Sequence, residues 1–149
     1  MVRFEHANLV VNEIERTLQF IQTAFPSWAV RGQGEMQWQG KTRRWLHVGN
    51  DDYYITLNDG AQEKNRFLKG HSAGLAHLGF VVDDIEEVIK RLQNSGYSID
   101  VNLADHAFRK NVYFIDPEGF QFEFVQYFSE FSHQKNTYES SMNIQLNQK

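Results

Sequence analysis

An internal repeat constrains this chain more than any other feature. Residues 4–15, FEHANLVVNEIE, return in similar form as residues 75–86, LAHLGFVVDDIE. Each copy places a histidine, His6 or His77, early in an apolar strand, and each ends that strand with a short polar segment that starts a helix. Such a repeat indicates two copies of one structural unit. We therefore expect the two histidines at equivalent positions and a chemical site at the junction of the units.

Composition excludes several classes of protein. The 149 residues are 41% hydrophobic and 23% charged, which is typical of one globular domain. The absence of cysteine excludes disulfides, thiolate metal sites and a cysteine nucleophile. With no apolar leader and no apolar stretch of about 20 residues, we expect a cytoplasmic protein without a membrane partner. Net charge is −4 and the basic residues are scattered, which argues against nucleic acid as a partner.

The first unit reads as a strand, a helix and three further strands. The pattern predicts a strand over 3–11 and a helix from Asn12 to about Ala24, with Glu15 completing a capping box and Pro26 beyond the end. Strands are expected over 28–31, 42–48 and 53–58, with Gly32-Gln33-Gly34 as a hairpin turn. A polar linker follows over 59–74.

The second unit repeats this order. A strand over 75–82 precedes a helix capped at Asp83 or Asp84 and closed by Gly96. The last strands are expected over 97–103, 111–115 and 120–128, with a turn over 116–119. We thus expect one domain over 1–128, composed of module one (3–58), the linker (59–74) and module two (75–128). The polar tail 129–149 is either solvated or packed on a partner subunit.

Strand alternation sorts the candidate ligands. Since successive side chains point to opposite faces, His6, His77 and Glu123 should all lie on the sheet faces away from the helices. Two imidazoles and one carboxylate form a facial ligand set for Fe, Mn, Co, Ni or Zn ions, with positions left open for substrate. The alternative is that the histidines are structural residues and that Glu123 is a solvated edge charge.

These residues resemble the vicinal oxygen chelate superfamily, which includes glyoxalases, bleomycin resistance proteins and extradiol dioxygenases. The resemblance rests on EHANLVV around His6, AHLGFVVDDI around His77, and YFIDPEGFQFE, which ends at Glu123. It implies an α+β fold in which two βαβββ modules form an eight-stranded, incompletely closed barrel around a metal. Three of the four ligand positions of the family match His6, His77 and Glu123, and the fourth falls at Thr56.

The resemblance also suggests residues that assist the metal. A threonine at the fourth position differs from the carboxylate or amide of glyoxalase I and methylmalonyl-CoA epimerase. Members with three ligands remain, namely extradiol dioxygenases and fosfomycin-modifying enzymes. The extradiol signature is matched by His106, Tyr113 and the turn before Glu123. It implies that His106 and Tyr113 are catalytic acid/base and orienting groups, whereas the simpler alternatives are a loop histidine and a barrel aromatic.

From this resemblance we expect a metal-dependent lyase, dioxygenase or transferase that acts on a small oxygenated molecule. The alternative is a metal-free drug-binding protein of the bleomycin-resistance type. We also expect a homodimer, in which each chain either closes its own barrel or exchanges modules, placing His6 of one chain beside His77 and Glu123 of the other. Two basic pairs, 43–44 and 109–110, could bind an anionic substrate or simply be solvated. Trp28, Trp38 and Trp45 could line the pocket or fill the core.

Overall fold

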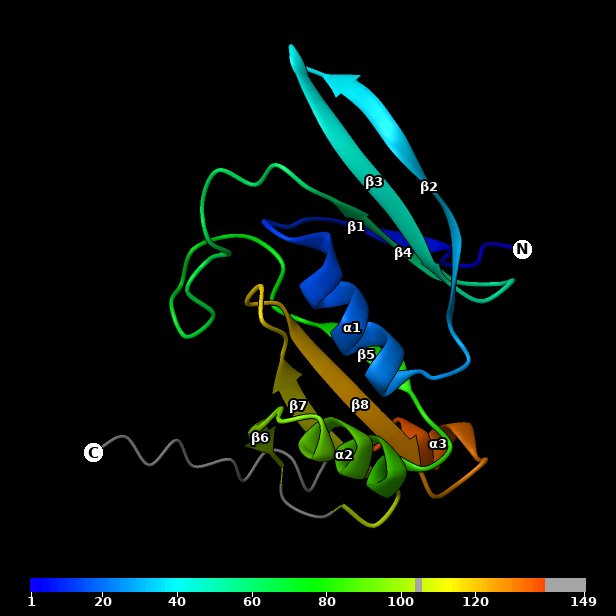
Figure 1. Cartoon of the computed structure of the whole chain (residues 1–149). Helices are drawn as coiled ribbons and strands as arrows, with labels where there is room; N and C mark the ends of the chain where they lie inside the picture. The colour runs from blue at the N-terminus through cyan, green and yellow to red at the C-terminus, as the bar shows by residue number, and fades with distance from the viewer. Residues whose placement is uncertain (104–105, 139–149) are drawn as a thin grey trace.

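The computed structural model describes residues 1–103 and 106–138, so most of the predicted tail, 139–149, lies outside the described residues. The chain forms eight strands and three helices in these ranges (Figure 1). Module one comprises β1 (His6–Val10), α1 (Ile14–Ala24), β2 (Ala29–Trp38), β3 (Lys41–Gly49) and β4 (Tyr54–Asn58). Module two comprises β5 (Leu78–Val81), α2 (Ile85–Asn94), β6 (Ile99–Asn102), β7 (Arg109–Ile115) and β8 (Gln121–Tyr127), and the short helix α3 (Ser132–Lys135) follows.

The two modules have the same topology. Their sheets have the strand orders β1-β4-β3-β2 and β5-β8-β7-β6. In each sheet the first strand pairs in parallel with the last strand of the module, and all other pairs are antiparallel. The repeat seen in the sequence is therefore a repeat of βαβββ units, and the predicted α+β class is confirmed. The two sheets do not close into a barrel within the described part of the chain.

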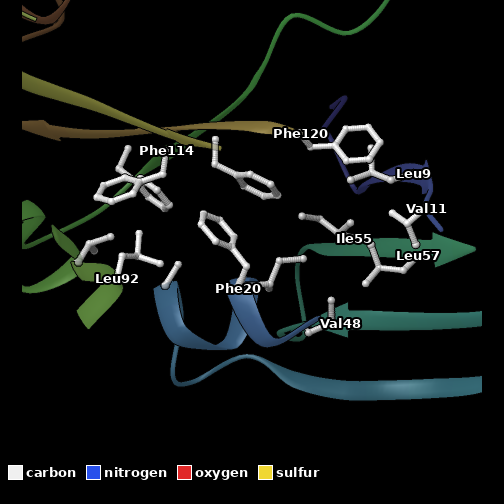
Figure 2. Packing of buried hydrophobic residues seen from close by; sticks show 14 of the residues in the cluster. Leu9, Val11, Phe20, Val48, Ile55, Leu57, Leu92, Phe114 and Phe120 are labelled. Atoms are coloured by element: carbon white, nitrogen blue, oxygen red, sulfur yellow. The ribbon is translucent and has the colours of Figure 1, made fainter. Parts of the chain in front are cut away.

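One hydrophobic core joins the modules. Helix α1 lies between the two sheets (Figure 1). The ring centroid of its Phe20 lies 4.9 Å from that of Phe122 on β8. The core continues from Leu9, Val11 and Leu57 in module one to Leu92 and Phe114 in module two (Figure 2). Because these apolar faces pack toward the shared core, the opposite, polar face of each sheet is turned away from it.

The start of α1 differs from the prediction. The N-cap is Glu13 rather than Asn12, and no side chain of α1 caps it. Instead the backbone N–H of Asn12 donates a 2.6 Å hydrogen bond to Oε2 of Glu118, a buried residue of module two. A carboxylate at a helix N-terminus satisfies a free amide and interacts favourably with the helix dipole. The predicted capping box was therefore wrong: the helix begins one residue later than expected, and the carboxylate near its start, Glu118, belongs to the other module.

The predicted hairpin turn at Gly32-Gln33-Gly34 was also wrong. Strand β2 runs through these glycines to Trp38, and the chain turns at Gln39 and Gly40, which have φ values of 48° and 77°. Gly34 instead makes room for the indole of Trp45 on β3. A Cβ built on Gly34 would lie 3.0 Å from that ring.

The predicted boundaries of α2 are confirmed. The side chain of Asp84 accepts a hydrogen bond from the Glu87 amide at 3.0 Å, which selects Asp84 over Asp83 as the N-cap. After the helix, Gly96 adopts a φ of 87°, as a C-terminal glycine stop requires. Within residues 1–103 and 106–138, none of the helices has the length and apolar character to cross a bilayer.

Candidate functional site

His77 and Glu123 meet on the polar face of sheet two. Glu123 lies on β8 directly beside Gly79 of β5, and His77 immediately precedes that strand. The Nε2 atom of His77 lies 3.1 Å from Oε2 of Glu123. A Cβ built on Gly79 would lie 3.6 Å from the same oxygen, which is an ordinary contact, so Gly79 lies directly against the Glu123 carboxylate. Two of the three predicted ligands are therefore neighbours.

Two further side chains hold the Glu123 carboxylate. The Tyr113 hydroxyl and the Asn111 amide both donate to its Oε1 atom, each at 2.6 Å. Both residues lie on β7, two positions apart, so alternation brings them to one face. Burial, together with the bond to Glu123, raises the pKa of Tyr113, so its hydroxyl stays protonated as a donor. Oε1 is thus engaged by two donors, while Oε2 faces His77.

His6 lies on the polar face of sheet one and not beside this pair. Its Nδ1 atom lies 2.9 Å from the Glu5 carboxylate, and its ring stacks on Tyr54 with a centroid distance of 4.7 Å. Over residues 1–103 and 106–138, no three His, Asp or Glu side chains are close enough to bind one metal ion. The shared core explains the separation, because it turns the two polar faces outward.

Of the two catalytic candidates, Tyr113 contacts Glu123 and His106 does not. The Nδ1 atom of His106 accepts a 3.1 Å hydrogen bond from the Phe108 amide, and its ring packs edge-on against Phe108. Its Nε2 atom is buried and has no hydrogen-bond partner among the described residues. Within one chain His106 is therefore part of the turn before β7.

The polar face of sheet one carries residues that the sequence analysis missed. Around a cavity of about 310 Å³ lie His6, Asn8, Met36, Trp45, His47, Tyr54, Thr56 and Asn58. Thr56, the residue at the expected fourth ligand position, is paired in register with Asn8 on β1 and His47 on β3. His47 could have been found from alternation on β3, since Leu46 and Val48 are buried on the opposite face. The same reasoning on β7 would have found Asn111 beside Tyr113.

His47 has an unusual environment for a histidine. Burial, the positive charge of Arg31 and the proximity of His6 lower the pKa of His47. The imidazole is therefore neutral at neutral pH. A neutral ring adds no charge to this face and presents an unprotonated nitrogen that can accept a hydrogen bond.

Arginines of the two basic pairs bond to other parts of the protein, and the three tryptophans lie in different environments. The Arg44 guanidinium pairs with Glu15 at 2.7 Å, and Arg109 donates to the backbone carbonyls of Lys135 and Thr137. Trp28 packs on Phe25 at the edge of the core, whereas Trp38 is half exposed near the hairpin tip. Of the three tryptophans, Trp45 lines the cavity on the polar face of sheet one.

Comparisons with known proteins agree with this architecture. Residues 3–124 match the family model of the Glyoxalase/Bleomycin resistance protein/Dioxygenase superfamily, while a search of curated proteins gave no match. A glyoxalase family protein from Bacillus cereus aligns with a TM-score of 0.72 and 13% identity, covering 87% of this chain and 96% of that one. A glyoxalase family protein from Enterococcus faecalis gives a TM-score of 0.63 at 23% identity, covering 84% and 96%.

A third solved structure is the fosfomycin resistance protein FosX from Listeria monocytogenes, complexed with Mn(II) and sulfate. It aligns with a TM-score of 0.63 and 15% identity, covering 92% of this chain and 99% of that one. At these identities the structural likenesses show the fold alone, whereas the family model matches most of the sequence. The chain belongs to the glyoxalase/bleomycin resistance protein/dioxygenase superfamily, the group also called the vicinal oxygen chelate superfamily.

Proposed function

We propose that this protein is a divalent-metal-dependent enzyme acting on a small substrate that chelates the metal through adjacent oxygens. The observation that carries the proposal is the arrangement of the Glu123 carboxylate. Oε1 is fixed by Tyr113 and Asn111, while Oε2 lies 3.1 Å from Nε2 of His77. Hydrogen bonds to the outer oxygen of a carboxylate are the usual support of a metal ligand. His77 and Glu123 therefore fit two positions of an Fe, Mn, Co, Ni or Zn site.

We further propose that the third ligand, His6, comes from a second copy of the chain. Each chain turns its two polar faces away from its own core, so a partner is needed to bring His6 next to His77 and Glu123. Strands β1 and β5 each pair with only one other strand in the described residues, so each has an open edge. Phe4 before β1 and Val81 on β5 are 70% and 69% exposed. A twofold dimer would cover these residues and complete two equivalent sites.

A metal bound there would act as a Lewis acid toward the substrate oxygens. Glu123, held by two donors, would keep a fixed orientation as a ligand of that metal. The Tyr113 hydroxyl would stay protonated and act as an orienting donor. Support for a metal-dependent enzyme with a small oxygenated ligand comes from a FosX variant from Listeria monocytogenes, which is complexed with Mn(II) and 1S,2S-dihydroxypropylphosphonic acid.

The test is metal loading followed by a substrate screen. Purified protein is reloaded with Mn(II), Fe(II) or Zn(II), and bound metal is measured by elemental analysis for the wild type, His77→Ala and His133→Ala. His133, an exposed residue of α3, is the matched control. We expect about one metal per chain in the wild type and in His133→Ala, and a loss in His77→Ala. Equal metal content in all three proteins would refute the site.

The loaded protein is then assayed with catechols, α-ketoaldehyde–thiol adducts and fosfomycin. Turnover of one of these substrate classes by the metal-loaded protein, and not by the metal-free protein, would support a metal-dependent enzyme. If the loaded protein turned over none of them while the metal-free protein bound a drug tightly, the function would be ligand sequestration of the bleomycin-resistance type.

A further inference from the structure

Four rings form a continuous strip on the polar face of sheet one. It begins at His6 and passes through Tyr54 and His47 to Trp45, and we call these four residues the aromatic strip. Successive ring centroids are 4.7, 4.7 and 4.9 Å apart. Tyr54, His47 and Trp45 are each partly exposed rather than buried in the core. The strip lines the 310 Å³ cavity described above.

The strand beneath the strip is shaped to hold Trp45 flat. Trp45 is paired in register with Gly34 on β2, and carbons of its indole ring lie 3.7 Å from the position that a Cβ of Gly32 would take. At Gly34 the corresponding distance is 3.0 Å, so a side chain there would push the ring away. These two glycines weaken a strand, because glycine is entropically unfavourable there. The gap that they leave is filled by the indole ring.

A positive charge lies beside the strip. The Arg31 guanidinium carbon lies 4.5 Å from the centroid of the Tyr54 ring. Unlike Arg44, it makes no ion pair with a carboxylate in the described part of the chain. Its charge is therefore available to an anionic ligand resting on the rings. Of the remaining lining residues, Asn8 and Asn58 bond each other at 2.6 Å, and the Met36 side chain is an apolar contact.

We propose that the aromatic strip and Arg31 form the substrate-selecting wall of the site, and that the substrate is a planar aromatic compound carrying a negative charge. Its ring would stack along Trp45 and His47, and its anionic group would face Arg31. This inference rests on the proposed function, because the bound molecule is a substrate only if the protein is an enzyme. Ring binding itself needs no metal, because none of the contacts involves one.

The test uses metal-free protein and two probes of equal charge, 1-naphthoate and cyclohexanecarboxylate, with dissociation constants measured by calorimetry. We expect 1-naphthoate to bind at least about tenfold more tightly, which corresponds to one good aromatic contact. Trp45→Leu and His47→Leu should each remove most of this preference for the flat probe. Arg31→Gln should weaken the binding of both probes equally, since each probe carries one negative charge.

Trp38 and Arg43 provide matched controls, because they form a second cation–π pair on the same hairpin, with 5.8 Å between the guanidinium carbon and the ring. Trp38→Leu and Arg43→Gln should leave the preference unchanged. Equal binding of the two probes by the wild type, or a preference that survives in folded Trp45→Leu and His47→Leu, would overturn the inference. If the metal site fails its own test while 1-naphthoate still binds to the strip, the strip is a binding site without the proposed chemistry.

Discussion

The ring of Phe20 on α1 lies 4.9 Å from the ring of Phe122 on β8, across the boundary between the modules. A helix of module one thus packs on the sheet of module two. This contact places both apolar faces inside one core, so the polar faces with His6 and Glu123 look outward on different sides. This separation is the reason why we propose that a site using both residues is assembled between two chains.

Removing the Tyr113 hydroxyl should weaken metal binding. Tyr113→Phe deletes one of the two hydrogen bonds to Oε1 of Glu123 and leaves the ring in place against His77. We expect the affinity for Mn(II) or Zn(II) to fall about tenfold, as is common when a hydrogen bond to a metal ligand is lost. Titration calorimetry on metal-free protein measures the change.

The control for this variant is Tyr127→Phe, on the neighbouring strand β8, whose ring contacts Lys135 and not Glu123. Its metal affinity should equal that of the wild type. Unchanged affinity in Tyr113→Phe would mean that Glu123 is not a ligand held by Tyr113.

The buried Asp116 should make stability depend on pH. Its carboxylate accepts hydrogen bonds from the hydroxyl of Thr17 and the amides of Glu118 and Phe120, yet burial raises its pKa. Between the ordinary pKa and the raised value, the folded state binds more protons than the unfolded state. The contribution of this residue to the free energy of unfolding therefore falls as pH rises through that window.

Asp116→Asn keeps an acceptor for both amides and removes the charge. The free energy of unfolding of this variant should not include the contribution of the Asp116 charge. We therefore expect the variant to gain stability relative to the wild type as pH rises through the window. Asp116→Ala leaves buried donors without a partner and should cost about 2–4 kcal/mol. Urea unfolding at several pH values tests both variants, and a wild-type contribution that grows with pH would contradict the raised pKa.

Glu118 should stabilise the contact between the modules. Its carboxylate accepts from the Asn12 amide at the start of α1, and its side chain is only 3% exposed. Glu118→Ala should lower the free energy of unfolding by about 1–2 kcal/mol, as for loss of a buried hydrogen bond to a charged group. Glu13→Ala is the matched control, since its ion pair with Arg16 is exposed and should contribute little. Equal losses in the two variants would contradict the role of Glu118.

The two glycines of β2 should differ in their tolerance of alanine. A Cβ at Gly34 would lie 3.0 Å from the Trp45 ring, so Gly34→Ala should displace the ring and destabilise the protein by about 1 kcal/mol or more. At Gly32 the nearest ring atom would be 3.7 Å away, an ordinary contact, so Gly32→Ala should be tolerated. Thermal unfolding and Trp fluorescence compare the two. A fluorescence spectrum of Gly34→Ala identical to that of the wild type would show that the ring does not rest there.

Much of the fold could be predicted because its signals are local. The repeat indicated two equal units, and helix α2 has its expected Asp84 cap and Gly96 stop. The error at Gly32 and Gly34 arose because glycine marks both turns and places where a large ring packs on a strand. At Asn12 the helix begins one residue later than the pattern indicated, and the partner of the Asn12 amide, Glu118, is distant in sequence, so no local pattern reveals it.

The site was predictable only within one sheet. Alternation predicts that His77 and Glu123 share one face, and the 3.1 Å contact between Nε2 of His77 and Oε2 of Glu123 agrees with that prediction. Tyr113, which the family resemblance suggested, donates to Glu123 on the same face. Alternation says nothing about how two sheets are oriented toward each other. The separation of His6 from the pair in one chain follows from the packing of α1 between the sheets, which the sequence pattern does not specify.

The shared site is tested most directly by refolding an equal mixture of His6→Ala and Glu123→Ala proteins and measuring bound metal. Either variant alone should bind none. If His6 is supplied by the partner chain, half of the refolded dimers are mixed and each has one intact site, so metal content should recover to about a quarter of the wild-type value. No recovery in a mixture that light scattering shows to be dimeric, or a protein that is monomeric, would contradict a metal site shared between two chains.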